Sequence, residues 1–148
     1  MKSVIDRLQL LMQLMLPLQQ LFALLLRVWI FQVFFMSGLT KIQSWSSTLM
    51  LFEYEYAVPL LSPALAAWLA TAGELILPVL LLVGLLGRFS ALGLFILNAV
   101  AVISYPDISP AGVQQHMMWG FMLAYLVLHG GGRLALDNWL VKRYRPAT

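Results

Sequence analysis

The chain has 148 residues, of which 61% are hydrophobic and only 10% are charged, with a net charge of +3. Soluble domains carry about 25% charged residues, so the composition excludes a soluble protein and indicates a protein embedded in lipid. The absence of cysteine excludes disulfides, thiol redox chemistry, thiolate-bound iron–sulfur clusters and covalently attached c-type haem.

The first twenty residues predict an amphipathic helix. Their apolar side chains recur at helical spacing, at Val4, Leu8, Leu11, Met15, Leu18 and Phe22. This pattern is typical of a helix that lies on the membrane surface and leads into a first span. A secretory signal is the alternative, given Lys2, Arg7 and the leucines, but no small-x-small cleavage site follows, so we expect none.

Four hydrophobic stretches follow, and a spanning helix needs roughly 20 such residues. They cover residues 21–39, 64–87, 89–105 and 113–129, with a tail at 130–148. The second and third stretches are separated only by the turn at Gly87–Arg88, which predicts an antiparallel hairpin. Three consecutive glycines, beginning at Gly130, are expected to end the fourth helix. We therefore predict an all-α fold: one domain over 1–148, a four-helix transmembrane bundle with an N-terminal amphipathic interfacial helix at 1–20.

The basic residues predict the orientation of these spans. With the N-terminus inside, the cytoplasmic segments hold Lys2, Arg7, Arg88, Arg133, Lys142, Arg143 and Arg145, whereas the outer loops hold only Lys41. Cytoplasmic loops carry an excess of lysine and arginine, so both termini are expected in the cytoplasm. Because these charges report topology, we expect the lipid bilayer as a partner and no nucleic acid.

Polar side chains within the spans are expected to meet. Glu74 lies in an apolar run, where an ionisable group costs at least ~2.5 kcal/mol, and Pro78 frees the carbonyl of Glu74. Counted at ~1.5 Å per residue from the cytoplasmic ends, Gln32, Glu74 and His116 lie at ~18–21 Å and Asn98 at ~15 Å. Arg27 lies lower, at ~10 Å, but its long side chain can extend along the helix, and polar groups in lipid face the bundle interior. The predicted intramembrane cluster comprises Arg27, Gln32, Glu74, Asn98 and His116.

Two interpretations of this cluster are open. As structural glue, Arg27 and Glu74 would form an ion pair, and the remaining members would complete its hydrogen bonds. As a functional site, the cluster would be a proton relay or a ligand site. We expect no metal site, because His116 and His129 lie near opposite ends of one helix.

The outer loops alternate acidic and aromatic residues. This mixture suits docking of a partner or covering of the bundle mouth, and the alternative is an interfacial or re-entrant segment that shields the helices. The candidate outer-face residues are Lys41, Glu53, Tyr54, Glu55, Tyr56, Tyr105, Asp107 and Trp119. No catalytic motif, phosphate loop or nucleophile–base pair is recognisable in the sequence.

Several short motifs, taken in order, resemble the DoxX family of small four-helix bacterial membrane proteins. They are Arg27, Gly38-Leu39-Thr40-Lys41, Tyr56-Ala57-Val58-Pro59, Glu74-Leu75-Ile76-Leu77-Pro78, Gly84-Leu85-Leu86-Gly87-Arg88, Tyr105-Pro106, His116 with Trp119, and Gly132-Arg133-Leu134-Ala135-Leu136-Asp137. The resemblance covers nearly the whole chain beyond residue 20. The N-terminal helix has no counterpart in the family pattern.

The resemblance implies a protein of the bacterial inner (cytoplasmic) membrane that works beside redox partners, as an accessory subunit rather than a stand-alone enzyme. It makes a quinone a candidate ligand, with no intrinsic cofactor, and a protein partner or a homo-oligomer is expected. The alternative is a small transporter or channel component that uses the intramembrane cluster as its path. Broken helices are typical of transporter sites, and Pro78 is the only predicted break, so the accessory subunit is favoured.

Overall fold

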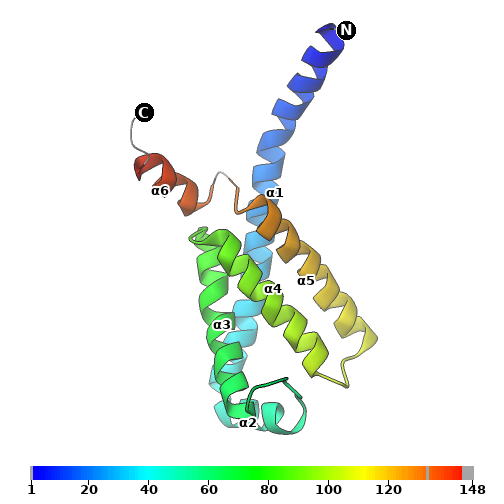
Figure 1. The fold of residues 1–148 in the computed structure, drawn as a ribbon, viewed down its shortest axis with the longest axis vertical. Helices are drawn as coiled ribbons and strands as arrows, with labels where there is room; N and C mark the ends of the chain where they lie inside the picture. The colour runs from blue at the N-terminus through cyan, green and yellow to red at the C-terminus, as the bar shows by residue number, and fades with distance from the viewer. Residues whose placement is uncertain (1, 133, 145–148) are drawn as a thin grey trace.

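The computed structural model describes residues 2–132 and 134–144, and these residues form helices and connections without a strand. This confirms the predicted all-α class. Figure 1 shows α1 running the length of the molecule, with the later helices folded back beside one half of it. The elements are α1 (Lys2–Gln43), α2 (Trp45–Tyr54), α3 (Pro63–Val83), α4 (Gly87–Ser104), α5 (Pro110–His129) and α6 (Leu136–Tyr144).

Three helical segments of the described chain are long and apolar enough to cross a membrane. They are Gln13–Gln43 within α1, α3 and α4. Helix α5 lies beside α4 and is 20 residues long, but it is more polar and is not among them. The described residues therefore contain three candidate membrane-spanning helices, whereas a fourth crossing by α5 stays a prediction.

The predicted boundary near residue 20 is not found. Helix α1 is one continuous helix of 42 residues that passes through Pro17. A proline inside a helix removes one backbone hydrogen bond, but the leucine, methionine and glutamine residues around it are strong helix formers, which explains the continuity. Residues 13–19 are all exposed, so no buried face distinguishes them. The side chains of Val4, Leu8 and Leu11 lie outside the described residues, and an interfacial orientation of this segment stays a prediction.

The bundle core lies where α1, α3, α4 and α5 meet. Its fully or nearly fully buried apolar side chains are Leu26, Ile30, Phe34, Leu81, Ala91, Leu94, Leu123 and Leu126. Glycines allow the helices to approach closely: a Cβ atom at Gly73 would lie 2.6 Å from Leu97 of α4. Small residues at helix contacts are the usual means of tight packing within lipid.

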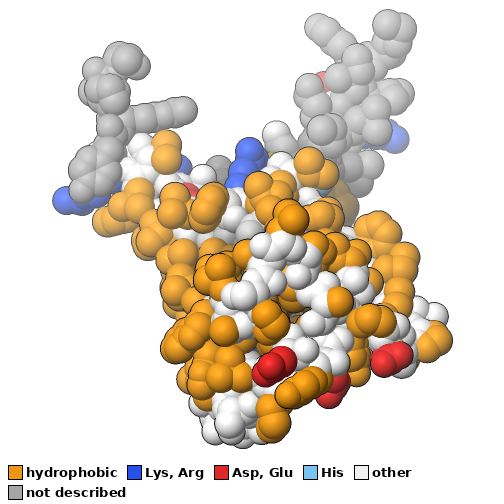
Figure 2. Space-filling model, turned by 60° about the horizontal axis from the view of Figure 1, so that its bottom comes forward, with side chains coloured by type: hydrophobic (Ala, Val, Ile, Leu, Met, Phe, Trp, Pro, Cys, Tyr) orange, Lys and Arg blue, Asp and Glu red, His pale blue; other side chains and the backbone are white. Residues whose placement is uncertain are grey.

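The two ends of the bundle differ in charge. Figure 2 shows acidic side chains at the end formed by α2, whereas the blue lysine and arginine side chains lie toward the opposite end. Hydrophobic side chains cover the intervening helical surface. An apolar belt between two polar ends is what a bilayer-embedded bundle requires.

Candidate functional site

Glu74 forms an ion pair with Lys41. The Nζ atom of Lys41 lies 2.6 Å from Oε2 of Glu74, and the two side chains are only 16% and 15% exposed. Lys41 Nζ also donates a hydrogen bond of 2.9 Å to Ser37 Oγ, one helical turn earlier on α1. The predicted outer loop began at Thr40, but α1 continues to Gln43, so Lys41 belongs to the helix and reaches the buried carboxylate.

Arg27 lies elsewhere, so the Arg27–Glu74 ion pair of the structural-glue interpretation is wrong. Its buried guanidinium donates through Nε to the carbonyl of Leu81 at 2.9 Å, through Nη1 to the carbonyl of Gly131 at 2.8 Å, and through Nη2 to the carbonyl of Leu82. The last carbonyls of a helix lack partners within the helix, so Arg27 caps the end of α3. This residue stabilises the end of the bundle remote from the ion pair.

Gln32 also lies outside the expected cluster, because its side chain is exposed. Helix geometry gives the reason. Arg27 and Gln32 are five residues apart, which places them about 140° apart around α1. Since Arg27 is 2% exposed and faces the interior, Gln32 must face outward.

A cavity of about 220 Å³ lies beside the Lys41–Glu74 pair. Helices α1, α3, α4 and α5 and the connection after α2 contribute its lining residues, which are Val33, Phe34, Ser37, Lys41, Tyr56, Glu74, Leu97, Ala101, His116 and Trp119. A second void of about 50 Å³ shares Lys41, Tyr56 and Glu74 with it. The structure therefore places charged, phenolic, imidazole and indole groups around one enclosed volume, which we call the ion-pair cavity.

Tyr56 closes the ion-pair cavity from the connection between α2 and α3. Its ring stacks on Phe52 with centroids 4.9 Å apart and lies 5.2 Å from Tyr105. The connection is held to α4 because the amide of Ala57 donates to the carbonyl of Ser104 at 2.8 Å. Burial raises the pKa of Tyr56, and the nearby carboxylate of Glu74 raises it further. The phenol is therefore kept as a neutral hydrogen-bond donor.

Helix α2 lies in the segment for which the sequence predicts either an outer loop or an interfacial or re-entrant segment, without a defined helix. It packs on α3 because Phe52 is buried against Ala66 and Ala67. The signal was present as apolar residues at helical spacing, Leu49, Phe52 and Tyr56, but a short stretch with two acids is equally typical of a loop.

Asn98 orients His116. The amide Nδ2 of Asn98 donates to the backbone carbonyl of His116 at 2.9 Å, and Oδ1 of Asn98 lies 2.9 Å from Nδ1 of His116. Because the carbonyl can only accept, the amide orientation is determined, so Nδ1 of His116 must donate to Oδ1. The imidazole also meets the Trp119 ring edge-on, with centroids 4.9 Å apart. The hydrogen bond to Asn98 and the contact with Trp119 fix the imidazole ring of His116, and Nε2 is its other ring nitrogen.

The predicted intramembrane cluster is thus divided. Glu74 and His116 line one cavity, Asn98 holds His116, and Arg27 and Gln32 do not take part. Sequence reasoning missed Ser37, although its position four residues before Lys41 places both on one face of α1.

The predicted outer-face residues also separate into two groups. Lys41, Tyr56 and Trp119 line the ion-pair cavity, and Tyr105 contacts Tyr56. The remaining ones are exposed and do not line it, namely Glu53, Tyr54, Glu55 and Asp107. Across residues 2–132 and 134–144, no three His, Asp or Glu side chains lie together as a metal site would require.

Apolar antiparallel helices around a half-enclosed ion pair define a small helical membrane protein. The DoxX family model matches residues 22–106, more than half of the chain. A relative from Haemophilus influenzae, described as an uncharacterized protein, is 36% identical over 132 residues, covering 83% of this chain and 85% of the relative. The chain therefore belongs to the DoxX family. No solved structure matches it.

Proposed function

We propose that the chain is a non-catalytic membrane subunit of a redox system and holds a quinone-type ligand in the ion-pair cavity. The observation that carries this proposal is a cavity that combines a charged pair with aromatic walls inside an apolar bundle. Ligand sites are typically lined by apolar and aromatic side chains with a few placed polar groups. This lining contains both kinds and is richer in polar groups, which belong to Ser37, Lys41, Tyr56, Glu74 and His116.

The chemistry of the lining suits a flat ring that bears carbonyl oxygens. The ammonium of Lys41 and the phenol of Tyr56 are donors for such oxygens, and Phe34 and Trp119 supply ring faces or edges. The volume of about 220 Å³ is below the ~300–1,000 Å³ of drug-sized sites, so it suits a head group whose tail lies outside. Glu74 and His116 are positioned to exchange protons with the ligand, while electrons would come from a partner.

We further propose a position in the bacterial inner membrane, with α1, α3, α4 and α5 crossing it and both termini in the cytoplasm. Helix α5 returns beside α4 toward the end where α1 begins, so α6 lies at that end (Figure 1). Most lysine and arginine side chains in Figure 2 lie toward that end, and the positive-inside rule favours a cytoplasmic position for an end rich in them. The ion-pair cavity then opens toward the outer half.

The exposed acids at the α2 end are the proposed docking surface for a redox partner. Glu53 lies near the end of α2, Glu55 precedes Tyr56 at the start of the α2–α3 connection, and Asp107 lies in the α4–α5 connection. A partner bound there would lie directly over the cavity. A second copy of this chain is the alternative occupant.

A transporter path through one copy of the chain has less support. Along α1, Ile30 and Phe34 lie between Arg27 and Ser37, and both belong to the packed apolar core. Arg27 itself is engaged by three carbonyls beyond that core.

The test is purification in mild detergent followed by extraction and quantification of bound quinone and identification of co-purifying proteins. Wild type should retain quinone, and Tyr56→Phe, which loses the phenolic donor but keeps the ring stack, should retain less. Tyr54→Phe is the matched control, because Tyr54 is 78% exposed and does not line the cavity. Wild-type protein that purifies alone and without quinone would refute the proposal.

A further inference from the structure

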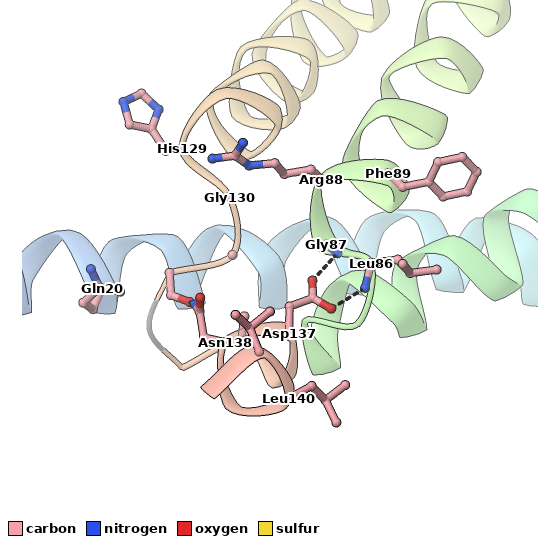
Figure 3. A pocket seen from close by; sticks show the side chains of 14 residues that line it. Gln20, Leu86, Gly87, Arg88, Phe89, His129, Gly130, Asp137, Asn138 and Leu140 are labelled. Carbon is pink, nitrogen blue, oxygen red and sulfur yellow. Dashed lines mark hydrogen bonds between the residues drawn. The ribbon is translucent and has the colours of Figure 1, made fainter. Parts of the chain in front are cut away.

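A second hollow lies at the opposite end of the bundle from the ion-pair cavity. It is an open hollow with a volume of about 690 Å³, lined by the start of α4, the end of α5, the glycines 130–132 and helix α6 (Figure 3). Gln20 of α1 contributes to one side. We call this volume the α6 hollow, and none of the groups proposed to hold a quinone lines it.

Among the described residues that line the α6 hollow, Arg88 is the charged side chain that is not engaged in a hydrogen bond or an ion pair. In Figure 3 its side chain extends from α4 across to Gly130, at the end of α5. A Cβ atom at Gly130 would lie 3.3 Å from Arg88 Nε, so the glycine allows the guanidinium to lie against the backbone. Among residues 2–132 and 134–144, the Arg88 side chain has neither a hydrogen bond nor an ion pair. A guanidinium presents five N–H donors, in a geometry that matches phosphate oxygens.

The carboxylate of Asp137, in the same hollow, already accepts two backbone hydrogen bonds. Oδ1 of Asp137 accepts from the amide of Leu86, and Oδ2 accepts from the amide of Gly87, both at 2.9 Å, as the dashed lines in Figure 3 show. Asp137 thereby caps the start of α4, which is the favourable place for a negative charge. It consequently does not neutralise Arg88, and Lys142 and Arg143 of α6 add further positive charge to this end.

The rim of the hollow is apolar and exposed. Leu86 is 57% exposed, Phe89 64% and Val141 55%, and all three line the hollow at the end of the apolar helices. A soluble ion would leave these side chains uncovered. A phospholipid would cover them with its glycerol and acyl chains while its phosphate met the guanidinium.

We propose that the α6 hollow binds the phosphate group of an anionic phospholipid, with Arg88 as the principal ligand. Basic pockets at the cytoplasmic ends of spanning helices are suited to anionic head groups. The proposal requires α6 to lie at the membrane surface, but it is independent of the quinone proposal. Its test therefore uses lipid binding alone.

The experiment uses the full chain in nanodiscs of phosphatidylcholine, with fluorescent phosphatidylglycerol as the probe. Arg88→Gln should weaken phosphatidylglycerol binding about tenfold or more, since a hydrogen bond to a charged group is lost. Lys142→Gln is the matched control: it removes the same charge from α6 outside the hollow, and its effect should be about fivefold at most. Arg88→Lys keeps the positive charge but loses the planar pair of N–H donors, so its affinity for phosphatidylglycerol should lie between those of wild type and Arg88→Gln. This variant replaces Arg88→Gln if Arg88→Gln fails to fold.

Two outcomes would overturn the proposal. Equal losses in Arg88→Gln and Lys142→Gln would show diffuse attraction to an anionic surface rather than a site. Displacement of the probe by millimolar inorganic phosphate would assign the hollow to a soluble phosphate rather than to a lipid.

Discussion

Lys41 Nζ and Glu74 Oε2 lie 2.6 Å apart and join α1 to α3 within the apolar part of the bundle. The lysine side chain extends back along α1 toward Ser37, which accepts a second hydrogen bond of 2.9 Å. A carboxylate buried among apolar helices requires a partner, and this contact supplies it. The same contact places two charged groups on the wall of a cavity.

The ion pair should be more sensitive to removal of one partner than of both. Lys41→Met leaves the Glu74 carboxylate uncompensated, and we expect the free energy of unfolding to fall by about 3–5 kcal/mol. The double variant Lys41→Met with Glu74→Leu removes both charges, and its free energy of unfolding should be close to that of wild type. Denaturant titration in mild detergent measures the difference. A double variant less stable than Lys41→Met would contradict this account of the pair.

Arg27 should be a major contributor to stability at the other end of the bundle. Arg27→Met leaves the carbonyls of Leu81, Leu82 and Gly131 without their shared donor, and we expect a loss of about 3 kcal/mol or more. Hydrogen exchange should rise at residues 84–88, where α3 turns into α4. The control is Arg7→Met, an exposed position on α1, which should change stability by less than about 0.5 kcal/mol. Equal effects of the two substitutions would refute the capping role.

Tyr56 should ionise at a higher pH than an ordinary tyrosine, because burial and the Glu74 carboxylate both raise its pKa. The unfolded chain has a tyrosine pKa of about 10, so between that pH and the folded pKa the native state holds the extra proton. The contribution of Tyr56 to the free energy of unfolding is therefore fully present below pH ~10, and it is lost as the pH rises through the folded pKa. Ultraviolet titration of wild type minus Tyr56→Phe isolates the transition, and a midpoint at or below the ordinary value would be inconsistent with a buried phenol.

The cysteine-free chain permits a direct measurement of topology. A cysteine at Tyr54, which is 78% exposed near the end of α2, should be labelled from outside intact cells by an impermeant thiol reagent. A cysteine at Asn138 on α6 should be labelled only after the cells are opened. Because α6 follows α5, the second site reports whether α5 crosses the membrane. Labelling of both sites from outside would show that it does not.

Local properties of the sequence determined the class of protein and the positions of its main helices. Apolar runs bounded by proline and glycine predicted spans at 64–87, 89–105 and 113–129, close to the observed α3 at Pro63–Val83, α4 at Gly87–Ser104 and α5 at Pro110–His129. Sequence also singled out Glu74 and His116, because polar residues in apolar helices are conspicuous. These features depend on neighbours within one or two helical turns.

Only the tertiary structure decided which polar groups meet. Depth along a helix can be counted, but the direction of a side chain changes by about 100° per residue, and its length adds several ångströms of reach. Arg27 therefore reached the end of α3 rather than Glu74, while Lys41, assigned to a loop, reached back into the bundle. The packing of α2 on α3, through Phe52 against Ala66 and Ala67, likewise depends on contacts between separate segments of the chain. Composition and periodicity thus determined the helices, and the rotation of each helix about its axis determined the site.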